Sequence, residues 1–214
     1  MCRIEQGNES ESNNQTNSAD NIDGIRTAIR NKYAEVSVSA DGKFQYPTGD
    51  EGAISLKYDQ EIIKSASHSL IESFCGVGNP FSLGNIRNGD VVLDVGCGAG
   101  FDMFVANRLV GKNGKVCGID LTDQMVEKSN KNFTEAGIKN FEIKKVDSEN
   151  IPYEDRTFDL VISNGVINLS PHKNKLFEEI YRVLKPGGHL QFADVVLNKE
   201  LPPHLSGSME AWSQ

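Results

Sequence analysis

The chain has 214 residues, of which 38% are hydrophobic, and this length supplies apolar material for one core rather than two. Its 22 Lys and Arg are scattered and outnumbered by 30 Asp and Glu, and the net charge of −8 excludes the basic surface of a nucleic-acid-binding protein. No apolar run approaches the roughly 20 residues of a membrane span, and the N-terminus lacks an apolar signal segment. We therefore expect a cytoplasmic protein with neither a nucleic-acid nor a membrane partner. The cysteines show no metal-binding spacing, so no metal site is predicted.

The N-terminal part of the chain divides into a tail and a helical region. Residues 1–20 are rich in Asn, Ser and Glu with almost nothing to bury, and we expect a disordered tail. A helix from residue 21 to about residue 36 is indicated by apolar residues at helical spacing, namely Ile22, Ile25, Ala28, Ile29 and Tyr33. After a turn-rich stretch, a second helix is predicted over residues 61–74. Together, residues 21–88 form a predicted N-terminal helical cap.

From residue 89 onward, strands and helices alternate. Strands are predicted at 91–96, 115–121, 141–147, 158–164 and 189–196. Helices are predicted at 101–110, 123–136 and 172–184, with a single turn at 149–151, and residues 185–188 (KPGG) predict a helix stop followed by a turn. This alternation predicts an α/β fold in which a parallel sheet is covered on both faces and any ligand lies at the carboxyl ends of the strands.

The stretch DVVLDVGCGAGFD, residues 90–102, places a glycine loop directly after the first of these strands. Two ligands compete for such a loop, a dinucleotide and S-adenosylmethionine. The dinucleotide fingerprint is G-x-G-x-x-G, and Phe101 stands where its third glycine should be. Asp94 and Asp102 flank the loop, where they would repel a pyrophosphate but suit the sulfonium and the α-ammonium group of S-adenosylmethionine. Charge therefore favours the methyl donor.

Other strand ends supply the remaining parts of a cofactor site. Asp120 lies 20 residues after Gly100, which is the separation expected of a carboxylate that binds ribose hydroxyls. Asp147 is predicted to reach the adenine amino group, and Asn164 to lie beside the methionyl part. Each feature alone also fits a tight turn or a helix cap, whereas their joint spacing favours a cofactor site. The predicted cofactor-binding residues are Asp94, Gly96, Cys97, Gly98, Gly100, Asp120, Leu121, Asp147, Ser148, Glu149 and Asn164.

The motifs LDVGCGAG, GIDL, YEDRTFDLVISN and RVLKPGGHL, in this order, resemble those of class I S-adenosylmethionine-dependent methyltransferases over about residues 70–197. The resemblance implies a Rossmann-like, largely parallel sheet of seven strands, whose last two strands form an antiparallel hairpin with the fifth. Residues 89–197 would then form the S-adenosylmethionine-binding domain. The last two strands of the family have no counterpart in this chain, and residues 198–214 are predicted to be the start of a truncated C-terminal region.

Three phrases resemble one branch of this family, the arsenite methyltransferases: CGVGNPFSLG (75–84), GAGFD, and SNGVINLSPHK (163–173). The resemblance implies methyl transfer to trivalent arsenic held by cysteine thiolates. This chain has Gly165 and Val77 where the branch has cysteines, and it lacks the region of the third thiolate. Cys75, two residues before Val77, is the remaining candidate catalytic residue, and its alternative role is packing of the cap. Cys97 and Cys117 are expected to pack in the interior.

Three functional hypotheses remain open from the sequence, with a dehydrogenase as a distant fourth. The first is an arsenite methyltransferase-like enzyme that methylates a small molecule, with trivalent arsenic as the acceptor that the resemblance implies. The second is methylation of an organic acceptor at carbon or oxygen, which would need a base, and Asp102, Glu149 and His172 are the candidates. The third is a cofactor-binding protein without turnover. The sequence pattern does not indicate an oligomeric state.

Overall fold

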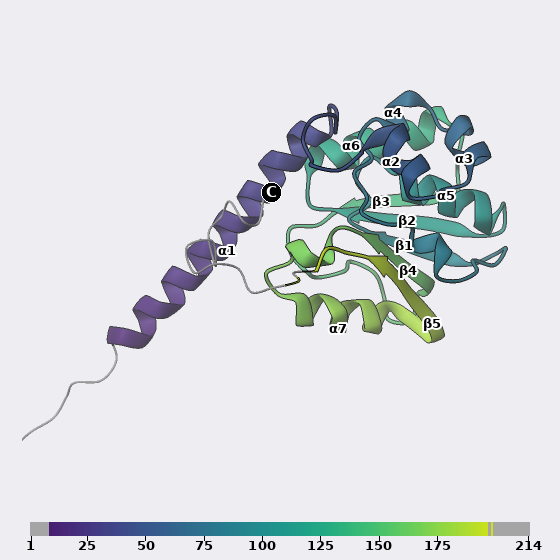
Figure 1. The fold of residues 1–214 in the computed structure, drawn as a ribbon. Helices are drawn as coiled ribbons and strands as arrows, with labels where there is room; N and C mark the ends of the chain where they lie inside the picture. Colours follow the sequence, from purple (N-terminus) through teal and green to yellow (C-terminus); the bar gives the residue numbers. More distant parts are fainter. Residues whose placement is uncertain (1–8, 197, 199–214) are drawn as a thin grey trace, which may run out of the picture.

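The computed structural model describes residues 9–196 and residue 198, and its centre is a five-stranded parallel sheet (Figure 1). The strands are β1 (Val91–Val95), β2 (Lys115–Asp120), β3 (Phe141–Lys145), β4 (Phe158–Asn164) and β5 (Leu184–Ala193). Their order in the sheet is β3-β2-β1-β4-β5, and all four neighbouring pairs are parallel. The order reverses between β1 and β4, where open α/β sheets bind their ligands. The predicted α/β fold is thus confirmed.

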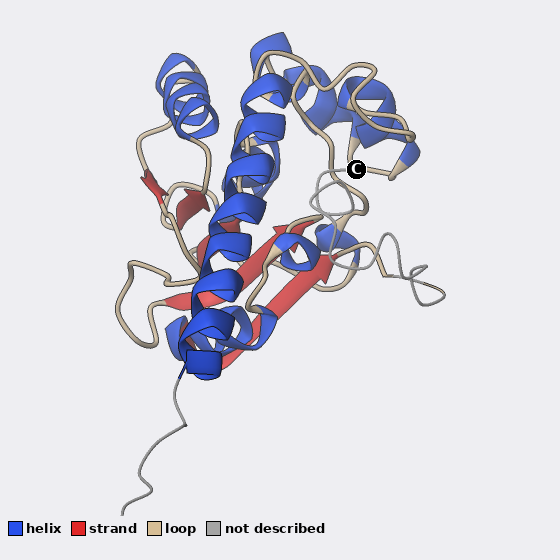
Figure 2. Ribbon diagram, turned by 90° about the vertical axis from the view of Figure 1, so that its left-hand side faces the viewer, coloured by secondary structure: helices blue, strands red, loops and turns tan. Residues whose placement is uncertain are grey.

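Helices cover both faces of the sheet (Figures 1 and 2). Helices α5 (Phe101–Val110) and α6 (Asp123–Glu135) lie on one face, and α7 (Lys173–Val183) lies on the other. Successive side chains of a strand point to opposite faces, so Val92 packs in the cluster under α5 while Leu93 packs in the cluster under α7. Both side chains are almost fully buried. The unbroken apolar runs of the sequence reflect this two-sided burial.

The N-terminal helix α1 (Glu9–Val36) begins twelve residues before the predicted start. Residues 9–20 therefore belong to a helix rather than to the predicted disordered tail. The predicted apolar positions anchor the C-terminal half, where Ile25, Ile29 and Val36 are buried. Once this half is fixed by packing, each further turn needs only its own backbone hydrogen bonds, and a polar sequence can extend it. The polar composition of residues 9–20 did not predict that the helix continues through them.

The single helix predicted over residues 61–74 is wrong, because two short helices occupy this stretch, α3 (Gln60–Ser65) and α4 (His68–Ile71). Ser67 is extended and its hydroxyl accepts a hydrogen bond from Leu70 N, so it caps α4 and separates it from α3. The preceding turn-rich stretch contains a further helix, α2 (Gly49–Ser55). Short 3₁₀ turns, η1 (Pro80–Ser82) and η2 (Ile167–Leu169), complete the loops at the carboxyl end of the sheet.

The prediction for residues 185–188 is also wrong, since they belong to β5 rather than to a turn. Strand β5 begins at Leu184, directly after α7, and pairs with β4 from Phe158 to Asn164. An irregularity in the pairing between Phe158 and Leu160 takes up the residues of the KPGG stretch, in which Gly187 has a φ of +82°. The turn expected at residues 149–151 forms no helix. No helix among the described residues is long and apolar enough to cross a membrane.

One lysine fastens the cap to the sheet domain. Lys128 of α6 donates to Glu72 Oε1 at 2.6 Å, to Ser73 Oγ at 2.8 Å and to the Ser37 carbonyl oxygen at 2.7 Å. Its side chain is only 14% exposed. The three acceptors come from the ends of α1 and α4, so a single ammonium group joins three helices.

We expect Lys128→Met to lower the free energy of unfolding by about 2 kcal/mol, because Glu72 would lose its partner in a poorly solvated position. Urea denaturation measures this change. Lys131→Met on the same helix is the matched control: the Lys131 side chain is 69% exposed, and its loss should cost less than about 0.5 kcal/mol. Equal effects of the two substitutions would contradict the fastening role of Lys128.

Candidate functional site

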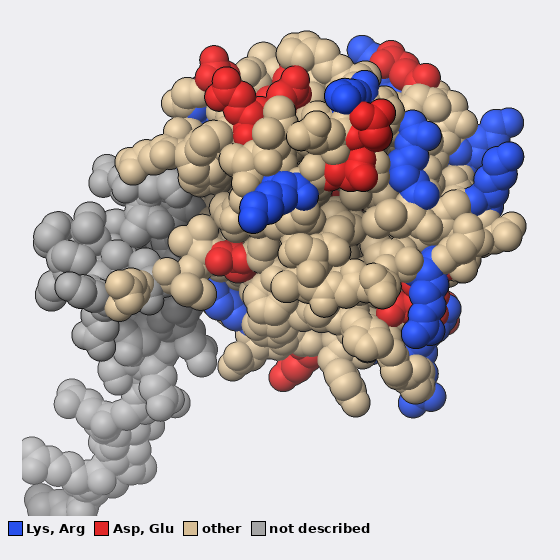
Figure 3. Space-filling view, turned by 45° about the vertical axis from the view of Figure 1, so that its right-hand side comes forward, with Lys and Arg blue, Asp and Glu red and all other residues tan. Residues whose placement is uncertain are grey.

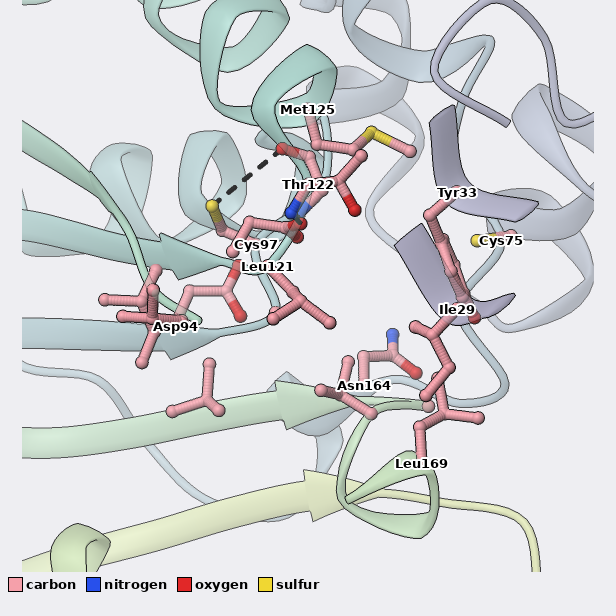
Figure 4. Close-up of a pocket in the computed structure, with 18 of the residues that line it drawn as sticks. Ile29, Tyr33, Cys75, Asp94, Cys97, Leu121, Thr122, Met125, Asn164 and Leu169 are labelled. Atoms are coloured by element: carbon pink, nitrogen blue, oxygen red, sulfur yellow. Dashed lines mark hydrogen bonds between the residues drawn. The ribbon is translucent and has the colours of Figure 1, made fainter. Parts of the chain in front are cut away.

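A cavity opens at the carboxyl ends of β1, β2 and β4, under helix α1 (Figure 4). Ten of the residues predicted from the sequence line it together: Cys75, Asp94, Gly96, Cys97, Gly98, Asp120, Leu121, Ser148, Glu149 and Asn164. These residues come from five separate segments of the chain. The structure thus brings most of the predicted site into one place.

Two predicted residues do not line the cavity. Gly100 has a φ of +95°, and a Cβ built there would lie 2.8 Å from Ser129 Oγ and 2.9 Å from a ring carbon of Phe133. The close packing of the loop on α6 requires a glycine at this position. Asp147 is exposed, while its neighbours Val146 and Ser148 face the cavity. Side chains alternate along an extended chain, and Asp147 therefore points to the other side from its two neighbours.

Backbone hydrogen bonds fix the glycine loop against β2. Gly98 N donates to Asp120 Oδ2 at 2.9 Å, and Thr122 N donates to Asp120 Oδ1 at the same distance. Gly96 N and Cys97 N both donate to the Ile119 carbonyl oxygen, at 2.8 and 3.0 Å. The Asp120 carboxylate is therefore part of the loop's own structure, and a ligand that reaches it meets a fixed group.

Three buried carboxylates surround the loop. Asp94, Asp102 and Asp120 are 2%, 7% and 9% exposed. Burial raises the pKa of Asp94 well above its usual range, and the charges of Asp102 and Asp120 raise it further. Burial also raises the pKa of Asp102 to about 6, although hydrogen bonds from Asn164 and Tyr58 lower it. Burial also raises the pKa of Asp120, although the hydrogen bonds from the backbone N–H groups of Thr122 and Gly98 lower it.

The only Lys or Arg among the described residues that line the cavity is Arg26 of α1. Its guanidinium donates to Glu149 Oε2 at 2.7 Å, and Ser170 Oγ donates to Glu149 Oε1 at 3.0 Å. Burial would raise the pKa of Glu149, but these hydrogen bonds and the Arg26 charge lower it below its usual value. Arg26 is thus neutralised by its own partner. The three aspartates therefore have no Lys or Arg partner among the described residues that line the cavity.

The sequence reasoning missed the contribution of helix α1. Arg26, Ile29 and Tyr33 line the cavity from this helix, and Ile29 and Tyr33 lie beside Cys75 in Figure 4. Their spacing indicated a helix that packs by an apolar face, and that face closes the cavity. Met125 and Thr122 of the α6 region also line it, without any sequence signal that distinguished them from core and capping residues.

Two of the cysteines line the cavity, and neither is activated. Cys75 lies opposite the glycine loop, and burial raises the pKa of its thiol to about 12, helped by the charge of Asp120. Cys97 donates from its thiol to the Gly98 carbonyl oxygen at 3.8 Å, the dashed line of Figure 4, and burial raises its pKa well above normal. Both thiols are therefore protonated at neutral pH. Cys117 lies on the other face of the sheet, as expected of a packing residue.

The two positions where the resemblance places cysteines lie in contact with each other, and of the two only Gly165 lines the cavity. A Cβ built on Gly165 would lie 3.4 Å from Val77 Cγ1. Gly165 has a φ of +73°, a conformation that L side chains rarely adopt. The pair Val77 and Gly165 therefore forms a small apolar contact at the place where two thiolates would otherwise stand.

A parallel sheet with its ligand cavity at the strand-order reversal, and a glycine loop after β1, defines a Rossmann-like ligand-binding protein. The family model of the methyltransferase domain matches residues 86–214. The arsenite methyltransferase of Halobacterium salinarum is 36% identical over 182 residues, which are 84% of this chain and 46% of that protein. The chain therefore belongs to the methyltransferase domain family, and its fold is that of the class I methyltransferases.

Two further relatives differ in what they methylate. The ubiquinone/menaquinone biosynthesis C-methyltransferase UbiE of Hydrogenovibrio crunogenus is 39% identical over 133 residues, 61% of this chain and 51% of that protein. The crystal structure of CrArsM, an arsenic(III) S-adenosylmethionine methyltransferase from Chlamydomonas reinhardtii, matches with a TM-score of 0.56 and 35% identity, over 75% of this chain and 53% of that chain. The chain spans about half the length of the curated relatives it matches.

The surroundings of Cys75 predict that its thiol is alkylated slowly. At pH 7.5 we expect iodoacetamide to alkylate Cys75 in the folded protein at least about tenfold more slowly than in the urea-unfolded chain, because a thiol with a pKa of about 12 is almost fully protonated. Mass spectrometry of the peptide that contains Cys75 measures both rates. Equal rates would show that this thiol is not shielded in the folded protein.

Proposed function

We propose that the cavity binds S-adenosylmethionine and that the chain transfers its methyl group to a small-molecule acceptor. The observation that carries this proposal is the set of three buried carboxylates, beside which the described part of the chain places no free Lys or Arg. A ligand with a sulfonium and an ammonium group supplies the missing positive charge, whereas a pyrophosphate would add to the repulsion. Bound S-adenosylmethionine would supply an electrophilic methyl group.

The proposed contacts follow the order of the strand ends. Asp94 at the end of β1 would accept from the α-ammonium group, with the loop at Gly96 and Gly98 against the methionyl chain. Asp120 at the end of β2 would bind the ribose hydroxyls while it keeps its two backbone donors, since each carboxylate oxygen can accept more than one hydrogen bond. Val146 and Ser148 would flank the adenine, in the place first given to Asp147.

The reaction needs orientation more than acid or base catalysis. A sulfonium leaves as a neutral thioether, so no proton has to reach the leaving group, and the chain contributes chiefly by holding donor and acceptor in line. Helix α1, held to the sheet side by the Arg26–Glu149 ion pair, would exclude water from this step. On the face that Figure 3 shows, Lys and Arg are interspersed with Asp and Glu, which supports a small acceptor over a polyanion.

The proposed acceptor is a soft small molecule of the kind that arsenite methyltransferases use. The support is the similarity to the Halobacterium and Chlamydomonas proteins and the position of Cys75 in the cavity wall. Trivalent arsenic binds thiolates strongly, and its lone pair can attack the methyl carbon. A single protein thiol would have to be complemented by thiols from solution.

A second candidate, methylation of an organic acceptor, is favoured by one specific observation. Val77 and Gly165 present an apolar contact instead of thiolates, and Cys75 is protonated. This wall suits an uncharged carbon skeleton better than a thiophilic ion. The similarity to the UbiE C-methyltransferase agrees with such an acceptor.

The donor site predicts the effect of losing Asp120. We expect Asp120→Ala to weaken the binding of S-adenosylhomocysteine at least about 30-fold, because the ribose acceptors and the anchor of the Gly98 loop disappear together. Isothermal titration calorimetry measures the affinity. Asp123→Ala, a nearby exposed carboxylate on α6, serves as the control and should change the affinity less than twofold. An unchanged affinity of Asp120→Ala would overturn the proposed site.

The identity of the acceptor is tested by identifying the methylated products. With S-adenosylmethionine, arsenite and excess glutathione, which supplies thiolates and reducing equivalents, we expect methylated arsenic by mass spectrometry. Cys75→Ala should abolish this product, and Cys117→Ala, which alters a thiol away from the cavity, should not. Intact binding of S-adenosylhomocysteine without any methylated arsenic would reject the arsenic acceptor and leave the organic acceptor as the candidate.

A further inference from the structure

A buried polar network joins the first turn of α5 to the end of β4. The Tyr58 hydroxyl donates to Asp102 Oδ1 at 2.7 Å, and Asn164 Nδ2 donates to Asp102 Oδ2 at 3.0 Å. Asn164 Nδ2 also lies 3.1 Å from the Tyr58 hydroxyl oxygen. Both carboxylate oxygens of Asp102 are thus engaged by neutral side chains from two other parts of the chain.

Asn164 carries this network to the backbone of residues 75–78, which we name the wall segment because Cys75 and Gly76 line the cavity. Its Oδ1 accepts from Val77 N at 2.8 Å and from Gly78 N at 3.1 Å, while its Nδ2 donates to the Gly78 carbonyl oxygen at 2.9 Å. A Cβ on Gly76 would collide with the same amide. The Asn164 side chain therefore holds the wall segment through both donors and acceptors.

Tyr58 stands at the centre of an aromatic cluster. It comes from the linker between α2 and α3, is 4% exposed, and lies 5.4 Å from the ring of Phe74, 6.0 Å from Phe81 and 5.4 Å from Phe101, measured between ring centroids. In such apolar surroundings a hydrogen bond to a carboxylate is strong, and a carboxylate oxygen that loses its donor is costly. The hydroxyl of Tyr58 therefore fixes the position of Asp102 and, through it, of Asn164.

We propose that Tyr58 is a positioning residue, which holds the wall segment in register with the glycine loop through Asp102 and Asn164 and through the contact of its own hydroxyl with the Gly78 carbonyl oxygen at 3.1 Å. Phe101 and Asp102 follow this loop directly, so the network ties the donor side of the cavity to the wall that faces it. The inference deepens the proposed function, on which it rests for its catalytic meaning. The hydrogen-bonded arrangement itself can be tested without any acceptor.

The test uses Cys75 as a reporter of the wall segment. In the full chain, iodoacetamide alkylation of Cys75, Cys97 and Cys117 is followed peptide by peptide by mass spectrometry. We expect Tyr58→Phe to raise the rate at Cys75 at least fivefold, and Asn164→Leu to raise it further, because Asn164 makes three hydrogen bonds to the segment and Tyr58 makes one. The rates at Cys97 and Cys117 should stay within twofold of the wild type, which a general loosening of the fold would not allow.

Tyr153→Phe is the matched control. Tyr153 also has a buried hydroxyl, but its ring packs on Phe158 on the other face of the sheet, and the substitution should leave the Cys75 rate within twofold. The proposal is overturned if Cys75 in Tyr58→Phe reacts as in the wild type, or if all three cysteines become faster together. Calorimetry with S-adenosylhomocysteine on the wild type separates the two proposals, because absent binding rejects the cofactor site while leaving the alkylation result interpretable.

Discussion

Mutual repulsion among three carboxylates that have been withdrawn from water is the constraint on which this structure depends. Asp94, Asp102 and Asp120 are placed by three different strand or helix ends, and no lysine or arginine within residues 9–196 pairs with them. Hydrogen bonds from Gly98 and Thr122 offset the burial of Asp120, and those from Tyr58 and Asn164 offset the burial of Asp102. The hydrogen bonds that stabilise Asp102 and Asp120 also shape the loop and the cavity wall.

The sheet and most of the site could be predicted from the sequence because both follow from short-range patterns. The buried strands are unbroken apolar runs, and a parallel sheet brings their polar ends to one edge, so Asp94, Asp120 and Asn164 had to lie near one another. The limits of β1, α5 and β4 needed no knowledge of tertiary contacts. Glycine spacing was less informative, because Gly100 serves the packing on α6 and looks the same in sequence as a ligand-binding glycine.

What sequence reasoning missed depends on contacts between distant parts of the chain. The ion pair of Arg26 and Glu149 joins residues 123 positions apart, and no local pattern announces it. In the sequence, Tyr58 is one more aromatic residue in a linker. Only the structure shows that its hydroxyl contacts Asp102 and Asn164. The division at Ser67 was missed for a different reason, since a capping serine inside an apolar pattern competes with the helix that the pattern favours.

The backbone at Gly165 limits how the cavity wall can change over evolutionary time. Its N–H donates to the Ala193 carbonyl oxygen at 2.8 Å while φ is +73°, so the residue joins β4 to β5 in a conformation that glycine tolerates best. A cysteine at this position cannot be gained by one substitution without backbone strain or a change in that pairing. Exchange of this glycine for cysteine would therefore cost stability, on the order of 1–3 kcal/mol for a non-glycine residue in this region of backbone space, before it could change what the cavity wall binds.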